Sequence, residues 1–120
     1  MNSLAVSIAS LHDDEKREVL RDLTNEQAAE LLHDWRFWAR PDQLPPEGDW
    51  SFWVLQSGRG AGKTRAGAEW VRAQVESGRC KRIALVARTA ADVRDTMVEG
   101  ESGIMAVCPP DNMPVYEPSK

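Results

Sequence analysis

The densest group of glycines in the sequence is followed at once by a lysine and a threonine. The segment consists of Ser57, Gly58, Arg59, Gly60, Ala61, Gly62, Lys63 and Thr64. It matches a nucleotide phosphate loop, in which a glycine and any four residues precede Gly-Lys-Ser/Thr, except that Ser57 replaces the first glycine. The spacing therefore predicts a site for the phosphates of a nucleotide such as ATP, together with Mg²⁺.

Each residue type has a chemical task in such a loop. Glycines let successive backbone N–H groups turn inward around a phosphate. The Lys63 ammonium would meet the β- and γ-phosphates, the Thr64 hydroxyl would bind Mg²⁺, and the Arg59 guanidinium would reach the γ-phosphate or a neighbouring group. Lys63 and Arg59 are therefore the candidate catalytic residues. The simpler interpretation is a glycine-rich turn with both side chains in solvent.

The elements around the loop are predicted to be those that this chemistry requires. The aromatic and β-branched run Ser51–Gln56 predicts a buried strand, and Thr64–Glu76 predicts a helix. The residues expected on the apolar face of that helix are Ala66, Trp70, Val71 and Val75. A second apolar run, Ile83–Ala87, completes a βαβ unit with parallel strands. The expected fold class is therefore α/β, with a mostly parallel sheet.

The chain before the loop predicts a helical arm. Helices are expected at about residues 12–22 and 25–38, with Thr24 and Gln27 forming a capping box. Three prolines and a glycine interrupt regular secondary structure at residues 40–50, which are expected to form a connecting loop. We therefore predict an N-terminal helical arm at residues 1–40 and a domain at residues 41–120 that contains the phosphate loop.

Beyond the second run the pattern is weaker. Thr89 is expected to cap a helix over about residues 90–98, and Asp92 and Asp95 are interpreted as helix-start acids rather than metal ligands. Two short segments are expected as strands: Ile104–Cys108 and Val115–Glu117.

The charge distribution and the short apolar stretches exclude some classes of protein. The 120 residues carry a net charge of -4, and residues 1–34 hold eight acidic and three basic residues. The arm is therefore not expected to bind nucleic acid. The longest apolar stretches are far shorter than the ~20 residues that span a bilayer, and residues 1–10 lack a signal-peptide pattern. We expect a cytoplasmic protein with no membrane contact.

The sequence offers few residues for metal binding or hydrolysis. No metal-ligand spacing occurs among the two cysteines (Cys80 and Cys108) and the two histidines (His12 and His33). Both cysteines are expected to be free thiols. No apolar run after Lys63 ends in Asp or Asp-Glu, and Ile83–Ala87 is followed by Arg88. Nucleotide binding is therefore better supported than nucleotide turnover.

The sequence also resembles a protein family. The stretch WRFWARPDQLPPEGDWSFWVLQSGRGAGKTRAGAEWVR (Trp35–Arg72), with RIALVARTAADVRDTMVEGESGIMAV and PVYEPSK, is similar to the start of the large terminase subunit of tailed phages and gene transfer agents. The resemblance implies an ATP-driven motor that packages double-stranded DNA into a procapsid, with a small terminase subunit and a portal as partners. It also implies a truncated P-loop ATPase domain, followed in full-length members by a nuclease domain.

The resemblance implies roles for particular residues. Gly58–Thr64 correspond to the family's Walker A segment, in which an arginine such as Arg59 is frequent. Gln43 aligns with a glutamine that contacts adenine in such motors; a polar loop residue is the equal alternative. Arg88 stands where the family more often has an acid, so a role for that acid is not carried over.

The length of the chain and its helical arm leave other functions open. Because family members are much longer, the chain resembles a truncated copy or a portion of a longer product. It would then lack the usual cover for four aromatic side chains: Trp50, Phe52, Trp53 and Trp70. A non-catalytic alternative is an interaction fragment, in which residues 11–38 dock on a packaging partner rather than on the chain's own core. A small nucleotide kinase would explain the loop. The chain length argues against such a kinase, and so does the lack of a basic lid segment.

Overall fold

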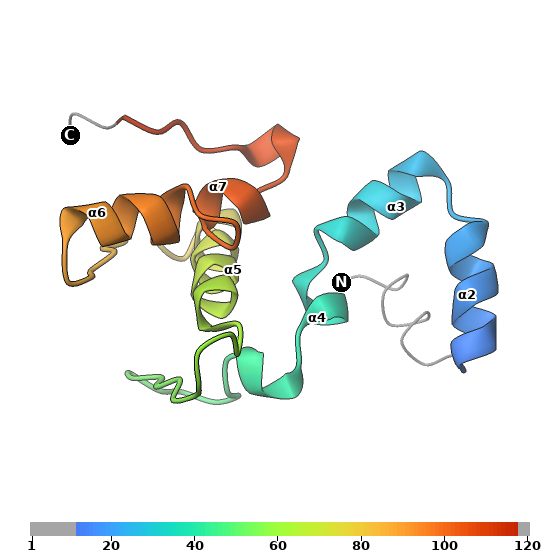
Figure 1. Ribbon diagram of the computed structural model, residues 1–120, viewed down its shortest axis with the longest axis horizontal. Coiled ribbons are helices and arrows are strands. Elements are labelled where there is room, and N and C mark those ends of the chain that lie inside the picture. Colours follow the sequence, from blue (N-terminus) through green and yellow to red (C-terminus); the bar gives the residue numbers. More distant parts are fainter. Residues whose placement is uncertain (1–11, 118–120) are drawn as a thin grey trace. The chain divides into compact units, whose positions relative to one another are not determined.

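The computed structural model describes residues 12–117, which belong to two compact units. The first unit ends at Leu44 and the second begins at Pro45, within the proline-containing loop expected at residues 40–50. About half of the structure is helical, and the described residues contain no β-strand (Figure 1). Leu11 and the segment 1–10, which entered the sequence predictions, lie outside the described residues.

Within residues 12–44, the first unit contains three short α-helices and one 3₁₀ helix. They are α2 (Asp13–Arg21), α3 (Asn25–Leu32), α4 (Trp35–Trp38) and η1 (Pro41–Gln43). The Thr24 hydroxyl accepts a hydrogen bond from the Gln27 amide at 3.2 Å, and the Gln27 side chain accepts one from the Thr24 amide at 3.0 Å. The predicted capping box is therefore confirmed.

The helix predicted over residues 25–38 is interrupted in the structure. At Asp34 the backbone is extended, with φ -91° and ψ 93°, and Asp34 becomes the N-cap of α4. Asp34 makes no side-chain cap hydrogen bond, so the break reflects the low helix propensity of aspartate rather than capping. The apolar stripe is thus divided between two helices.

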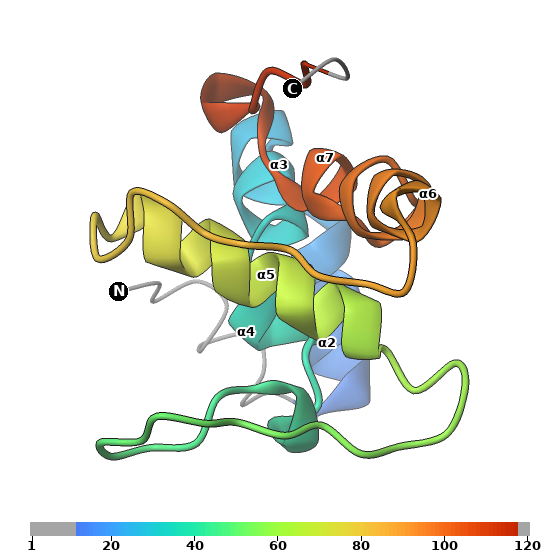
Figure 2. The same ribbon diagram turned by 90° about the vertical axis from the view of Figure 1, so that its left-hand side faces the viewer.

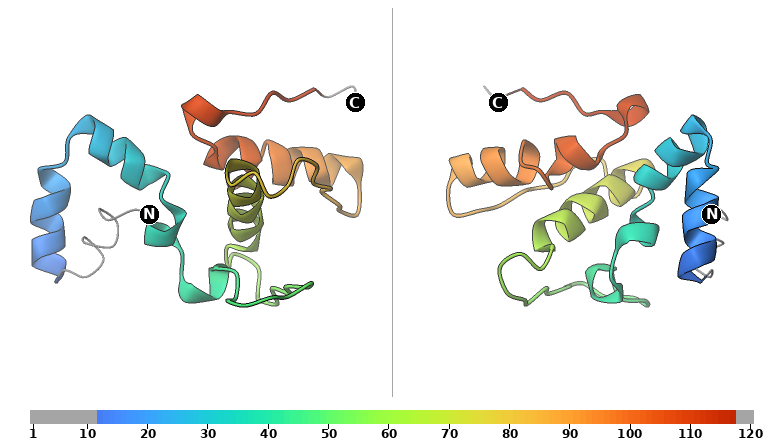
Figure 3. Two further views of the ribbon diagram at one scale, coloured as in Figure 1. Left: turned by 180° about the vertical axis from the view of Figure 1, so that it is seen from behind. Right: turned by 45° about the vertical axis from the view of Figure 1, so that its right-hand side comes forward.

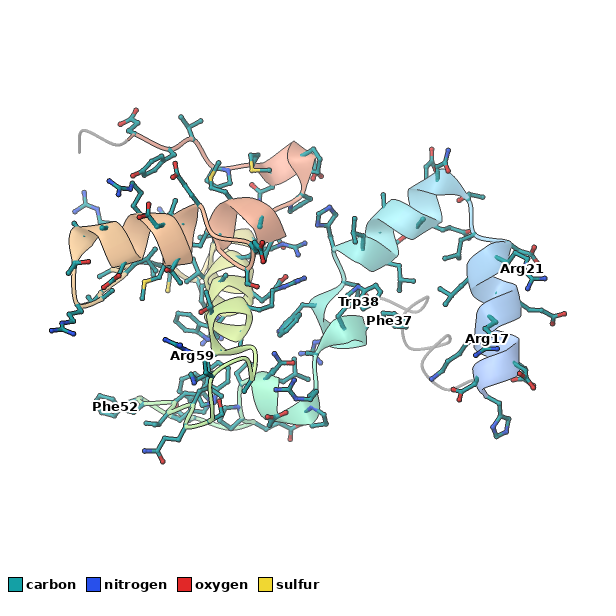
Figure 4. The ribbon with its side chains drawn as sticks, viewed as in Figure 1. Arg17, Arg21, Phe37, Trp38, Phe52 and Arg59 are labelled. Atoms are coloured by element: carbon teal, nitrogen blue, oxygen red, sulfur yellow. The ribbon has the colours of Figure 1, made fainter. Side chains whose placement is uncertain are left out.

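A small hydrophobic core stabilises the first unit. Leu31 is buried and packs against three partly buried side chains: Val19, Leu23 and Phe37. The rings of Phe37 and Trp38 meet edge to face, with their centroids 4.9 Å apart (Figure 4). The Trp38 indole N–H donates a hydrogen bond to the Leu31 carbonyl at 2.8 Å, so the polar end of this partly exposed side chain is satisfied.

The second unit is built around α5 (Lys63–Glu76), which confirms the helix predicted after the loop. The chain leaves this helix through Gly78, whose φ of +75° favours glycine. Helix α6 (Ala90–Asp92) follows and continues as the π-helix η2 (Val93–Val98). The Thr89 hydroxyl accepts a hydrogen bond from the Asp92 amide at 3.0 Å, which confirms the predicted cap.

Two short helices follow η2 in the second unit. They are α7 (Ile104–Val107) and the 3₁₀ helix η3 (Pro110–Asn112). Both α7 and η2 contact α5 and each other (Figures 2 and 3). A Cβ on Gly103 would lie 2.8 Å from the Met97 carbonyl oxygen, so the close approach before α7 requires a glycine.

The predicted α/β fold, with its mostly parallel sheet, is wrong for the described residues. Ser51–Gln56 and Ile83–Ala87 are extended but pair with no strand within residues 12–117. Phe52 is 89% exposed and Val86 is 80% exposed. A parallel strand needs hydrogen-bonded neighbours and cover on both faces, and the described part of the chain supplies neither to these runs.

Two further strand predictions also fail. Ile104–Cys108 contains helix α7, and burial of Gly103, Val107 and Cys108 at helical spacing shows why the helix is preferred. Val115–Glu117 is extended without a strand partner in the described residues, and Val115 is exposed. The short apolar run 104–108 could not be assigned by periodicity because it is too brief.

Candidate phosphate-binding loop

The predicted loop residues, 57–64, lie together between the extended run 51–56 and the first turn of α5. Two of the three glycines have the left-handed backbone that favours glycine: φ is +81° at Gly60 and +83° at Gly62. Such residues let neighbouring N–H groups face an anion. At Gly58 a Cβ would meet open space, so this glycine is not required by a close contact.

The Lys63 side chain folds back over the loop. Its ammonium donates hydrogen bonds to the Ser57 carbonyl at 2.7 Å and to the Gly58 carbonyl at 3.1 Å. An ammonium has three N–H groups, so these two bonds leave one for a ligand. Lys63 is exposed, as the simpler interpretation expects, and its ammonium lies against the backbone to which the sequence pattern assigns a phosphate.

The loop leads directly into the N-terminus of α5. Gly62 is the N-cap, and the helical hydrogen bonds begin with the Ala66 amide, which donates to the Gly62 carbonyl at 3.0 Å. The first N–H groups of a helix have no partner within the helix and carry its positive dipole end. Thr64 is exposed in this first turn, so its hydroxyl is accessible to a ligand.

Arg59 adds a second cation to the loop. It lies in an exposed turn ahead of α5, where Figure 4 shows its side chain. Between Asp49 and Glu69 the sequence contains no acidic residue but three basic ones: Arg59, Lys63 and Arg65. The loop is therefore a locally positive segment in a chain of net negative charge.

Gln43 belongs to the first unit, whereas the loop belongs to the second. It is buried, and its side-chain oxygen accepts a hydrogen bond from the Arg40 amide at 3.0 Å. This bond ties Gln43 to its own 3₁₀ helix. The proposed contact with adenine remains a prediction from the resemblance.

No protein-family model, curated protein or solved structure matches this chain. The interpretation of the loop therefore depends on its residues and geometry.

The structure shows one group of charged residues that sequence reasoning missed. Along one face of α5, alternating charges form a ladder of four residues: Arg65, Glu69, Arg72 and Glu76. Glu69 is 3% exposed and bridges Arg65 at 3.0 Å and Arg72 at 3.4 Å. The bridge between Arg72 and Glu76 is 2.9 Å long. The i,i+4 spacing of opposite charges was a visible signal for this ladder.

Burial shifts the pKa values of two side chains in this part of the second unit. Desolvation raises the pKa of Glu69, while Arg65 and Arg72 oppose the shift. Burial likewise raises the pKa of the thiol of Cys108, the C-cap residue of α7, against the influence of Arg72. Cys80 and Cys108 are free thiols, as predicted. The buried thiol is thereby disfavoured as a reactive thiolate.

The expected apolar face of α5 is wrong in part. Ala66 is buried, but Val75 is 51% exposed, and the buried set extends to Ala68 and Glu69. The buried part of α5 thus includes Glu69 of the charged ladder, whose carboxylate is satisfied by its arginine partners. Periodicity of apolar residues alone could not reveal this orientation.

The carboxylate of Asp95, on η2, has a structural partner. Arg94 binds the Asp95 carboxylate through bonds of 2.7 and 3.2 Å, and the bond to Arg94 lowers the pKa of Asp95. Within residues 12–117, no three His, Cys, Asp or Glu side chains gather as a metal site.

Among the described helices, none has the length and apolar character needed to cross a lipid bilayer.

Proposed function

We propose that residues 57–64 bind the phosphates of Mg²⁺-ATP and that the chain is the nucleotide-binding module of a terminase-type DNA-packaging motor. The observation that carries the first part is the Lys63 ammonium, which lies 2.7 Å from the Ser57 carbonyl over the loop. The second part is supported only by the sequence resemblance to large terminase subunits. It would place the chain's activity in the cytoplasm.

The chemistry of the loop fits a triphosphate. Lys63 supplies a point charge and one remaining N–H group, and Gly60 and Gly62 supply the backbone conformation of an anion-binding loop. The start of α5 adds its positive dipole end. Bound Mg²⁺ would neutralise phosphate charge, with the Thr64 hydroxyl as one oxygen ligand.

Within the described residues, the loop joins a helix on one side only, although the Lys63 ammonium also binds the Ser57 and Gly58 carbonyls. Its C-terminal half is fixed by α5, but its N-terminal half follows a run in which Phe52 and Val54 are exposed. Binding must therefore order part of the backbone, which reduces affinity. We expect weaker binding than in a loop held between a buried strand and a helix, and little ATP turnover by this chain.

Isothermal titration of the intact chain with Mg²⁺-ATP tests the proposal. Lys63→Ala should weaken binding by about tenfold or more, because it removes the ammonium that would pair with the phosphates. Lys81→Ala is the matched control, since Lys81 is an exposed lysine outside the loop. A Lys63→Ala variant that keeps the wild-type circular dichroism spectrum and the wild-type affinity would refute the assignment.

A second candidate function uses the first unit. Leu32 and Trp38 are exposed although both belong to helices with apolar stripes, which favours docking of this unit on another protein. Cross-linking from Cys residues introduced at Leu32 and Trp38 distinguishes the candidates. Products with a co-expressed small terminase subunit or portal support docking, whereas links confined to the chain itself exclude it.

A further inference from the structure

Two extended runs in the second unit share one pattern of exposure. In each run, apolar side chains alternate between exposed and half-buried positions. The exposed ones are Phe52, Val54, Ala84 and Val86, and the half-buried ones are Trp53, Leu55, Ile83 and Leu85. The alternation means that each run presents one apolar face to solvent, as a strand with an uncovered face does.

The two runs do not meet within one copy of the chain. Run 51–56 and run 83–87 follow different sides of α5 (Figures 1 and 2). The side chain of Phe52 points away from the helices of its unit (Figure 4). Neither run belongs to a strand in residues 12–117. Extended, exposed apolar segments of this kind are templates for pairing with another chain.

Opposite charges precede the two runs. Glu47 and Asp49 lie just before the first run, and a basic trio lies just before the second: Arg79, Lys81 and Arg82. All five side chains are exposed. Within the described residues, none of the five takes part in a salt bridge. Both flanks are therefore available to a partner of opposite charge.

We propose that the partner is a second copy of this chain, in which run 51–56 of one copy lies alongside run 83–87 of the other in the same direction. This alignment brings Glu47 and Asp49 near the basic trio and joins the two exposed apolar faces. Run 83–87 paired with itself would oppose like charges, either trio against trio or trio against Arg88. Run 51–56 paired with itself in the same direction would oppose acid to acid.

A second copy is a better occupant than an unrelated protein because each copy carries both complementary halves. Two copies can then exchange runs reciprocally, so that the contact is made twice in one dimer. The inference is independent of nucleotide binding, since it uses neither Lys63 nor Thr64.

Sedimentation velocity over a series of protein and salt concentrations tests the proposal on the intact chain. The wild type should dimerise as its concentration rises, and added salt should weaken the dimer. One charge variant, Arg79→Glu with Lys81→Glu and Arg82→Glu, and another, Glu47→Lys with Asp49→Lys, should each dissociate about tenfold more readily. An equimolar mixture of the two variants should regain association, because the opposite flanks again differ in charge.

The control keeps the net charge of the first variant but changes the other unit: Arg17→Glu, Arg21→Glu and Arg36→Glu, all at exposed positions. It should associate like the wild type. Phe52→Ser with Val54→Ser should reduce association without reversing any charge. A wild type that stays monomeric at all concentrations would overturn the proposal, and so would salt-independent association. A mixture that associates no better than its components would do the same.

Discussion

Helix α5 and run 51–56 lie on either side of the same loop. The difference between them shows that regular structure forms here only where the backbone hydrogen-bond partners are close in sequence. Every residue in the body of α5 finds its backbone partner within the helix, one turn away. A strand finds its partners only on another segment. The described chain supplies none to the run, and Val54 is 73% exposed.

The same contrast appears in the side chains. Helix α5 buries Ala66, Ala68 and Glu69, and its ladder satisfies the buried carboxylate. The run buries none of its side chains completely, although it is richer in large apolar residues. Apolar composition therefore does not by itself decide burial in this chain. Contact with a neighbouring element does, and α7 and η2 provide that contact for α5.

The contrast predicts its largest effect at Glu69. Glu69→Ala should lower the free energy of unfolding by about 3 kcal/mol, because it leaves Arg65 and the largely buried Arg72 without their shared carboxylate. Urea unfolding followed by circular dichroism measures this loss. Glu30→Ala, at an exposed position of α3, is the control and should change stability by less than about 0.5 kcal/mol. Equal effects of the two changes would show that the ladder does not stabilise α5.

Proline substitution compares the helix and the run directly. Ala68→Pro should cost about 3 kcal/mol because it removes a hydrogen bond inside α5 and clashes with the preceding turn. Val54→Pro should change stability by less than about 0.5 kcal/mol, since Val54 lies in no strand. Both variants are unfolded at low protein concentration, so that self-association does not contribute. A loss of several kcal/mol from Val54→Pro would mean that the run is a strand in solution.

The dependence of stability on pH gives a smaller and sharper test of the ladder. Burial raises the pKa of Glu69 above its ordinary value of 4.5, so the folded chain holds this proton more tightly than the unfolded chain. The stability gained from this proton is complete at pH below the pKa of Glu69 in the unfolded chain. It is lost as pH rises through the pKa of Glu69 in the folded chain. The stability of the wild type relative to Glu69→Gln should therefore fall as pH rises above 4.5 and then level. A relative stability that increases over that range would mean that the two arginines outweigh burial.

Features that depend on a few adjacent residues were predictable from the sequence. The caps at Thr24 and Thr89 and the extent of α5 are as predicted, because each depends on contacts three or four residues apart. The break at Asp34 was missed because the apolar spacing continues through it. The strand predictions are wrong because a strand needs pairing with segments distant in sequence, and a short apolar run does not show whether such a partner exists.

Within the candidate site, the sequence indicated which residues lie together but not all of their contacts. Residues 57–64 form one loop, and the two glycines with positive φ are among the three that were singled out. The contact of Lys63 with the Ser57 carbonyl was not foreseen, since it depends on the path of the loop. The i,i+4 pair Arg65 and Glu69 was visible, but its burial depends on the segments that pack on α5, which lie far from it in sequence.

Hydrogen exchange of the intact chain, measured by mass spectrometry with and without Mg²⁺-ATP at low protein concentration, tests the central claim most directly. We predict that the nucleotide slows exchange in peptides covering residues 57–66, that Lys63→Ala abolishes this effect, and that run 51–56 exchanges rapidly in every case. Unchanged exchange at residues 57–66 in saturating nucleotide, or equal slowing in Lys63→Ala, would contradict a phosphate site in this loop.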